Sequence, residues 1–236
     1  MGVIAVGSLH GSPGATTLAL DLARANGPDT LLIEADPDGG CLAARLELAV
    51  RPGLTELAGA ARTGIATDDL WRFAQLASGG VAVIVAHPAA EQVQAALRAA
   101  VHHVAAALQN VDGNVLIDLG RVRPGSPALG FAALADTTII VAANSVDSVV
   151  TIHHRRQLLA GVGDVRLVLD DESPYSAAEI ERTTGSAVWG VVPRSHGRRS
   201  ATRRHRRVAQ LLAALDGASG EAVFDMAVSP LAAVTA

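Results

Sequence analysis

Short runs of apolar, mostly β-branched residues recur along the chain, and longer segments rich in alanine and leucine separate them. This alternation is typical of βα units arranged around a parallel sheet. Several runs are apolar almost throughout rather than at every second residue, which indicates strands buried on both faces. The pattern predicts one α/β domain, a three-layer sandwich whose mostly parallel central sheet has about seven strands.

The same pattern gives approximate positions for the elements. Strands are predicted at residues 3–8, 30–35, 81–86, 114–119, 137–142, 165–170 and 187–192. Helices are predicted at residues 16–25, 54–62, 68–77, 90–109, 127–135, 146–160, 176–184 and 201–215. No linker divides the chain, so we assign residues 1–216 to one domain and residues 217–236, which lack strong periodicity, to a tail that is partly loose.

Composition excludes several classes of protein. Half of the 236 residues are hydrophobic and 18% are charged, which excludes a disordered chain. The single cysteine excludes an internal disulfide and a cysteine-rich zinc site. No apolar run approaches the roughly 18 residues needed to cross a bilayer, and no basic segment precedes the first apolar run. We therefore expect a cytoplasmic protein with no transmembrane segment.

The most informative segment connects the first predicted strand to the helix that follows it. It consists of His10, Gly11, Ser12, Pro13, Gly14, Ala15, Thr16 and Thr17. Small residues let successive backbone N–H groups surround an anion, and a helix N-terminus adds partial positive charge. The two glycines would allow close approach, the first threonine would offer a hydroxyl to Mg²⁺, and the second would lie near the phosphates. We assign the whole loop to nucleotide binding.

This loop resembles the deviant Walker A motif of the MinD/ParA family, whose pattern is Lys-Gly-Gly-x-Gly-Lys-Thr-Thr. In that family the second lysine reaches the β- and γ-phosphates, and the first reaches across a dimer to the partner's phosphates. His10 and Ala15 stand at these two positions, and all 19 basic residues of the chain are arginine. The resemblance implies a degenerate nucleotide site that keeps the loop and has lost its lysines.

Acidic residues extend the resemblance in the same order along the chain. Residues 31–40 resemble the switch I segment, with Glu34 and Asp36 at its two acidic positions. Residues 115–120 resemble the Walker B strand and switch II, with Asp118 at the end of the strand. The resemblance implies that Asp36 orients the attacking water, and that Thr16, Asp36 and Asp118 hold Mg²⁺ through water.

A later strand bears on recognition of the base. Residues 165–170 resemble the strand that usually ends in an adenine-reading asparagine, and Asp170 replaces that asparagine. A carboxylate accepts a hydrogen bond from the adenine amino group but donates none to a ring nitrogen. We include Asp170 among the nucleotide-binding residues.

The resemblance implies a positioning or assembly factor of the CpaE/TadZ type, which localises pilus, secretion or other cell-organising machinery. Its cofactors would be ATP or ADP with Mg²⁺, or none if the loop is an empty strand-to-helix turn. Loss of one preorganised donor typically costs about 10² to 10³ in rate, so we expect little or no ATPase activity. We also expect a homodimer and a protein partner.

The alternative is an active, ATP-dependent dimerising switch, such as a chromosome- or plasmid-partitioning ATPase that binds DNA non-specifically. It requires another cation at the phosphates, for which Arg121, Arg24 and His10 are candidates.

Positive charge is concentrated near the end of the chain. Six arginines and no acid lie between residues 198 and 207: Arg198, Arg199, Arg203, Arg204, Arg206 and Arg207. The formal net charge is −4, so the rest of the chain carries −10. The cluster predicts a basic helix that contacts an acidic protein partner, DNA phosphates or an anionic membrane surface, or else forms a solvated face. We favour the solvated face over DNA binding, since no recognition motif accompanies the charge, and among the functional uses we favour the acidic protein partner.

Overall fold

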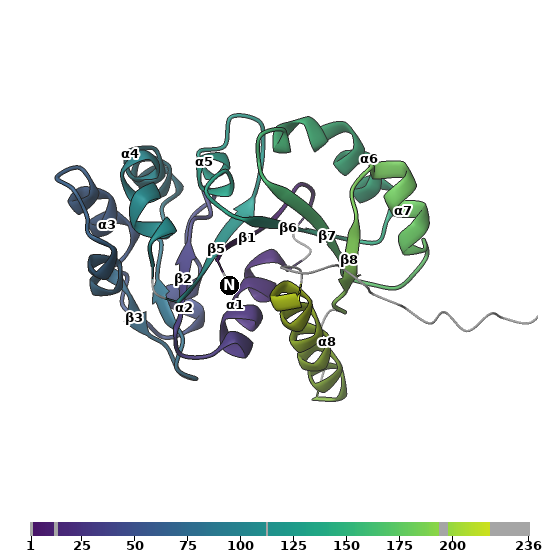
Figure 1. Cartoon of the computed structure of the whole chain (residues 1–236), viewed down its shortest axis with the longest axis horizontal. Helices are drawn as coiled ribbons and strands as arrows, with labels where there is room; N and C mark the ends of the chain where they lie inside the picture. The colour runs from purple at the N-terminus through teal and green to yellow at the C-terminus, as the bar shows by residue number, and fades with distance from the viewer. Residues whose placement is uncertain (1, 12–13, 112, 194–197, 218–236) are drawn as a thin grey trace, which may run out of the picture.

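The computed structural model describes residues 2–11, 14–111, 113–193 and 198–217 (Figure 1). An eight-stranded sheet forms its centre, in the order β3-β4-β2-β5-β1-β6-β7-β8. The strands are β1 (Val3–Ser8), β2 (Thr30–Glu34), β3 (Gln75–Leu76), β4 (Ala82–Ile84), β5 (Asn114–Arg121), β6 (Thr137–Ala142), β7 (Asp164–Leu169) and β8 (Val188–Val191). Every neighbouring pair is parallel except β3 with β4. The predicted mostly parallel sheet is confirmed, with eight strands where we expected about seven.

Helices cover both faces of this sheet, as Figure 1 shows. One face carries α1 (Ala15–Asn26), α2 (Leu42–Arg45) and α8 (Arg198–Gly217). The other carries α3 (Leu54–Ala61), α4 (Ala90–Gln109), α5 (Ala128–Ala132), α6 (Val146–Arg155) and α7 (Ala177–Thr184). Two short 3₁₀ helices, η1 (Thr67–Phe73) and η2 (Arg156–Leu159), complete the elements. The three-layer sandwich is therefore confirmed.

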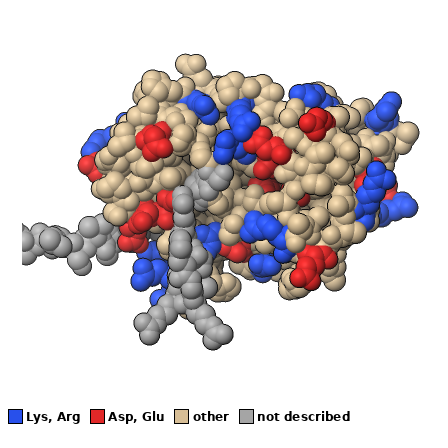
Figure 2. Space-filling model, turned by 180° about the vertical axis from the view of Figure 1, so that it is seen from behind, with Lys and Arg blue, Asp and Glu red and all other residues tan. Residues whose placement is uncertain are grey.

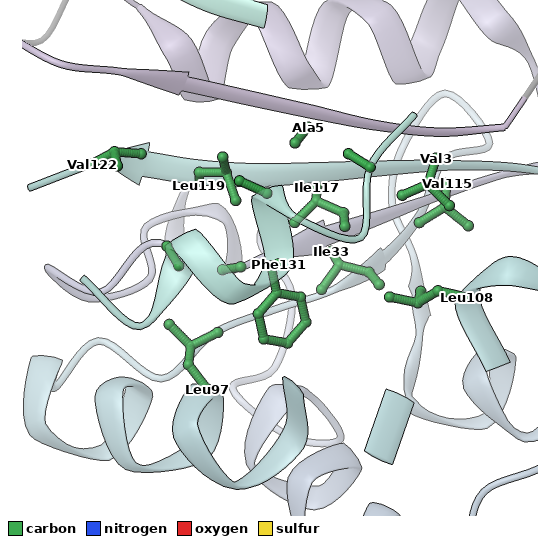
Figure 3. Close-up of a cluster of buried hydrophobic side chains, with 14 of the residues drawn as sticks. Val3, Ala5, Ile33, Leu97, Leu108, Val115, Ile117, Leu119, Val122 and Phe131 are labelled. Atoms are coloured by element: carbon green, nitrogen blue, oxygen red, sulfur yellow. The ribbon is translucent and has the colours of Figure 1, made fainter. Parts of the chain in front are cut away.

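The central strand explains why the apolar runs are continuous. Val3 and Ala5 of β1 belong to the buried cluster beneath α4 and α5, which Figure 3 shows around Phe131. Ile4 and Val6, which point to the opposite face, belong to the cluster beneath α1 and α8. Because successive residues of a strand face opposite sides, two covering layers require an apolar residue at every position.

One predicted element is wrong and another was missed. Residues 68–77, predicted as a helix, form η1 and then β3, which pairs antiparallel with β4. The Gln75 side chain fixes this strand by donating to the carbonyls of Ala49 and Pro52, at 2.8 and 2.7 Å. Such contacts between distant residues leave no periodic signal in the sequence. Helix α2 has only four residues, too few to show helical periodicity.

Three adjacent parallel strands end at one edge of the sheet. They are β1, β2 and β5, which end at Ser8, Glu34 and Arg121. After β1 the chain forms β2, which lies on one side of β1 in the sheet. Strands β6 to β8 lie on the other side of β1. Ligands of open α/β sheets bind at the carboxyl ends of the strands where the order reverses in this way.

The described helices include none that is both long and apolar enough to cross a membrane. Of the predicted tail, Gly217 ends α8 and residues 218–236 lie outside the described residues.

Candidate functional site

Two glycines shape the loop between β1 and α1. Gly11 has a φ of 63° and Gly14 a φ of 96°, both in the left-handed region. A Cβ atom at either position would meet no atom within 4 Å, so the backbone conformation rather than lack of space favours glycine here. Gly14 is the N-cap of α1. Ser12 and Pro13, which we assigned to the same site, lie outside the described residues.

A cavity of about 360 Å³ lies beside this loop. Its lining residues are Ser8, Gly11, Gly14, Ala15, Thr16, Thr17, Asp36, Asp38, Cys41, Arg45, Gly120 and Arg121. The volume lies in the range of small-ligand pockets. The structure thus brings five residues of the predicted loop together with the predicted Asp36.

Asp118 is completely buried within β5, which continues to Arg121, and lies two residues before Gly120 of the cavity lining. Its Oδ1 accepts a hydrogen bond from the Gly120 N–H at 3.1 Å, and among the described residues its Oδ2 has no hydrogen-bond partner. Burial raises the pKa of Asp118 to about 7, although the Thr16 hydroxyl and the Gly120 N–H act in the opposite direction. A buried carboxylate oxygen without a partner, near a threonine hydroxyl, fits a Mg²⁺ ion or one of its waters.

The described residues hold no group of three or more His, Cys, Asp or Glu side chains that could bind a metal by themselves.

Asp36 lies on the cavity side of the loop after β2. Burial raises its pKa to about 6, while the Asp38 N–H, 2.9 Å from Oδ1, acts to lower it. The backbone of Gly120 packs directly against this carboxylate, and a Cβ at Gly120 would overlap it. Gly120 also has a φ of 58° and follows a register shift between β1 and β5, which corresponds to a bulge.

We therefore expect Gly120→Ala to lower the free energy of unfolding by about 2 to 4 kcal/mol. The alanine would hold a left-handed backbone conformation that strains it, and its Cβ would overlap the Asp36 carboxylate. Urea denaturation measures this change. Gly125→Ala is the matched control, because Gly125 has a φ of 73° with open space around it and should cost only about 1 to 2 kcal/mol. Equal losses in the two variants would contradict the close packing against Asp36.

Glu34, the other acidic residue of this segment, does not line the cavity. It is 1% exposed, and both of its oxygens accept hydrogen bonds from backbone N–H groups. Oε1 accepts from Cys41 and Leu42 at 2.6 and 2.8 Å, and Oε2 accepts from Ala86 at 2.8 Å. Glu34 therefore holds the start of α2 against the segment after β4.

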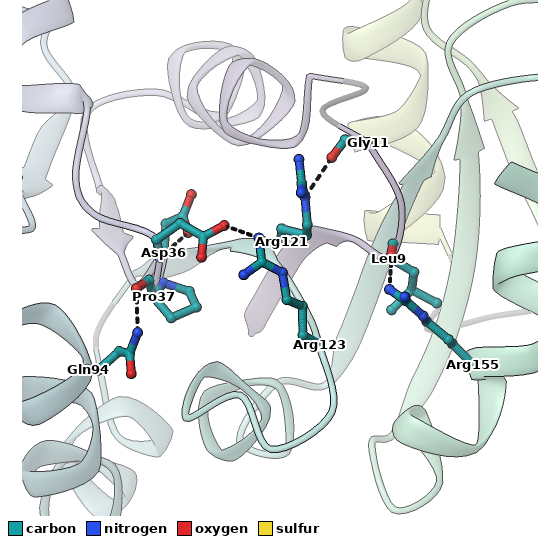
Figure 4. Close-up of polar contacts among 9 residues, drawn as sticks. Leu9, Gly11, Asp36, Pro37, Gln94, Arg121, Arg123 and Arg155 are labelled. Atoms are coloured by element: carbon teal, nitrogen blue, oxygen red, sulfur yellow. Dashed lines mark hydrogen bonds and ion pairs between the residues drawn. The ribbon is translucent and has the colours of Figure 1, made fainter. Parts of the chain in front are cut away.

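His10 turns toward α6 of its own chain. Its Nε2 lies 2.9 Å from Oδ2 of Asp147, and its Nδ1 lies 3.4 Å from the Thr151 hydroxyl. Arg155 of the same helix donates to the Leu9 carbonyl at 2.8 Å (Figure 4). His10 does not line the cavity, so its assignment to nucleotide binding stays a prediction.

Asp170 follows β7 and is also buried. Its Oδ1 accepts a hydrogen bond from the Asn144 N–H at 2.9 Å, which fixes the turn after β6. The Asn144 side chain in turn donates to the carbonyls of Asp171 and Tyr175. Asp170 does not line the cavity beside the loop, and its role in reading the base stays a prediction.

Two arginines line the cavity beside a loop that has no lysine or arginine among its described residues. Arg121 donates from Nε to the Gly11 carbonyl at 3.0 Å, as Figure 4 shows, and Arg45 donates to the Thr17 hydroxyl at 3.2 Å. Arg121 was a predicted substitute for the lysines, whereas Arg45 was missed because no motif marks it. Arg24, the other predicted substitute, is exposed in the last turn of α1 and does not line the cavity.

Comparisons with known proteins identify solved structures that have the same fold. No protein-family model matches the sequence, and no curated protein matches it. Solved structures do match. The septum site-determining protein MinD from Pyrococcus horikoshii, complexed with Mg-ADP, aligns with a TM-score of 0.72 at 18% identity, over 93% of this chain and 97% of that one.

Two further structures align over most of their lengths. A ParA family ATPase from Chlorobium tepidum has a TM-score of 0.71 at 15% identity, over 89% of this chain and 98% of that one. Cobyrinic acid a,c-diamide synthase from Mycobacterium smegmatis, with a bound ATP analogue and magnesium, has a TM-score of 0.62 at 15% identity, over 92% and 98%.

The chain therefore has the fold of the P-loop nucleoside triphosphatases. Within that class, its architecture is the MinD/ParA form, and the predicted resemblance is confirmed at the level of the fold. A synthase shares this fold with positioning proteins, so the function has to be argued from the site.

Proposed function

We propose that this protein is a MinD/ParA-type positioning or assembly factor, of the CpaE/TadZ type, that binds Mg²⁺–ADP or Mg²⁺–ATP and hydrolyses ATP slowly or not at all. One observation carries the proposal: the cavity keeps the glycine-shaped loop, and next to its lining residue Gly120 the buried Asp118 has an oxygen with no hydrogen-bond partner among the described residues, while the loop has no lysine. We infer that it acts as a homodimer through contacts with a protein partner.

The residues present support binding of a nucleotide. The N–H groups at the start of α1 point toward the loop, and the helix adds partial positive charge there. Thr16 and Asp118 would hold Mg²⁺, which when bound neutralises phosphate charge. Asp36 stands at the same cavity and would orient a water molecule. A MinD structure of the same fold contains Mg-ADP.

The missing lysines argue against rapid turnover. Removing one preorganised donor of transition-state charge usually costs about 10² to 10³ in rate, and two such positions are changed here. Binding depends less on these lysines, because backbone amides and a helix N-terminus also attract phosphate.

Calorimetric titration with Mg²⁺–ADP and Mg²⁺–ATP, combined with a phosphate-release assay, tests this proposal. We expect saturable binding and a turnover at least about 10²-fold below the typical enzyme range of 1 to 10³ per second. Asp118→Ala should remove the Mg²⁺-dependent part of the binding, and Ala15→Lys should strengthen binding. Turnover within the ordinary range that is abolished by Asp118→Ala would refute the degenerate site.

The arginine-rich helix α8 supplies a surface for the partner. Arg203 and Arg206 are exposed, whereas Arg204 is buried and donates to Asp21 of α1 at 2.6 Å and to the Pro193 carbonyl at 3.1 Å. Arg207 pairs with Glu172 at 3.1 Å. Arg204 therefore anchors the helix, and among the arginines of α8 whose side chains the structure describes, Arg203 and Arg206 are exposed to an acidic partner.

The second candidate is an active, ATP-dependent dimerising switch that binds DNA. Its support is the pair of arginines in the cavity, which restore positive charge near the loop. Figure 2, by contrast, shows acidic and basic side chains interspersed on the face away from the viewer of Figure 1, rather than a broad basic surface.

Salt-sensitive DNA binding that is lost in Arg203→Ala/Arg206→Ala would favour the second candidate. Under our proposal, we expect no binding of a random DNA duplex at 50 mM salt. Both arginines are exposed, so the double variant should fold normally, whereas Arg204→Ala would disturb the packing of α8. ATP-dependent dimerisation that disappears in His10→Ala would be further support for the switch.

A further inference from the structure

We propose that Arg45 and Arg121 take the place of the two missing loop lysines and bind the phosphates of a nucleoside di- or triphosphate. The inference rests on the proposed nucleotide binding and adds to it the groups that supply the positive charge. It assigns a ligand-binding role to Arg45, a residue outside every motif of the sequence.

Arg121 contacts the first half of the loop. It follows Gly120 at the end of β5, and its Nε donates to the carbonyl of Gly11 at 3.0 Å. Gly11 is the neighbour of His10, which occupies the first lysine position and faces α6 instead of the cavity. Arg121 of β5 therefore contacts the residue that follows the first lysine position.

Arg45 contacts the second half of the loop. It is the last residue of α2, and its Nη2 donates to the Thr17 hydroxyl at 3.2 Å. Thr17 is two residues beyond Ala15, which occupies the second lysine position. The buried carboxylate of Glu34 binds the first N–H groups of α2 and so fixes the helix that carries Arg45.

The cavity also holds acidic side chains, whose charge cations beside a polyphosphate would offset. Asp36 and Asp38 line the cavity, and Arg123 pairs with Asp38 at 2.8 Å, so Arg45 and Arg121 would offset the charge of Asp36 and of the phosphates. Arg45 and Arg121 are the only basic residues among the described lining residues. A guanidinium presents five N–H donors in one plane and matches phosphate oxygens well. Because the arginines would contact phosphates rather than a base, affinity should rise with the number of phosphates.

Titration of inorganic pyrophosphate and of Mg²⁺–ADP tests the inference, using Arg45→Ala, Arg121→Ala and the double variant. Each single variant should bind both probes about 10- to 100-fold more weakly, the range expected for one hydrogen bond between charged groups. Arg45→Lys and Arg121→Lys should recover part of the loss. Arg24→Ala is the matched control, because Arg24 is exposed at the far end of α1 and should leave both affinities unchanged.

The two probes distinguish a failure of the arginine assignment from a failure of the proposed function. Alanine variants that bind both probes as tightly as Arg24→Ala would overturn the role of the arginines and leave the proposed function intact. Arginine-dependent binding of pyrophosphate without binding of Mg²⁺–ADP would uphold the phosphate site and refute the nucleotide proposal. If the wild-type protein binds neither probe, both are refuted. If an alanine variant unfolds, Arg45→Gln and Arg121→Gln keep the side-chain stem, and the same loss is expected from them.

Discussion

Replacing Asp118 with asparagine is expected to make the ligand-free protein more stable at pH 8 and, under the proposed function, to remove the Mg²⁺-dependent part of nucleotide binding. The wild-type carboxyl is completely buried, and burial raises its pKa from 3.8 to about 7. Between these values the unfolded chain has released a proton that the folded protein retains, so the stability of the folded protein falls as the pH rises. At about 1.4 kcal/mol per pKa unit, the loss amounts to roughly 4 kcal/mol by pH 8.

Asparagine carries no charge at any pH and keeps an oxygen that can accept from the Gly120 N–H. Urea denaturation from pH 4 to pH 8 should therefore show similar stabilities at pH 4 and a growing advantage for Asp118→Asn above it. Under the proposed function, Mg²⁺–ADP should raise the melting temperature of the wild-type protein more than that of the variant. Asp29→Asn, at an exposed position, should change stability by less than about 0.5 kcal/mol. Parallel pH curves for Asp118→Asn and wild type would contradict the prediction.

The second large effect is expected for Glu34→Ala, which should lower the free energy of unfolding by about 3 to 6 kcal/mol. The substitution leaves the N–H groups of Cys41, Leu42 and Ala86 without their acceptor, and each such group costs about 1 to 3 kcal/mol when buried. Because the start of α2 is released, Arg45 should lose its fixed position as well, and binding of pyrophosphate should weaken.

Urea denaturation compares Glu34→Ala with Glu34→Gln, which keeps the acceptor for Cys41 and Leu42 but places a donor opposite the Ala86 N–H. We expect an intermediate loss of about 1 to 3 kcal/mol for Glu34→Gln. Glu91→Ala, on the exposed first turn of α4, should cost less than about 1 kcal/mol. A loss for Glu34→Ala no greater than that of Glu91→Ala would show that the carboxylate does not hold α2.

The sequence predicted the fold well because the fold depends on local patterns. Continuous apolar runs marked the strands, and their spacing indicated the covering helices, as β1 with its two buried faces illustrates. The prediction failed at residues 68–77, where Gln75 is held by carbonyls more than twenty residues away in the sequence. Helix α2 is too short to produce a periodic signal.

The candidate site was predicted only in part. The loop and Asp36 were identified from local motifs, and the structure brings them to one cavity. The motifs did not reveal that Glu34 binds three backbone N–H groups, since two of its partners lie beyond residue 40 and the third beyond residue 85. Arg45 was missed for the same physical reason: its proximity to Thr17 arises from the docking of α2 and not from sequence spacing.

The packing of α8 against α1 has a consequence for how the protein matures on the ribosome. Arg204 pairs with Asp21 across 183 residues, and Val208, Leu211 and Leu212 share a buried cluster with Leu18 and Leu22. During translation the side of α1 that packs against α8 stays uncovered until α8 emerges, because Arg204 follows Asp21 by 183 residues. A nascent chain that stalls before residue 198 would therefore expose an apolar stripe, which is the kind of surface that chaperones and proteases recognise.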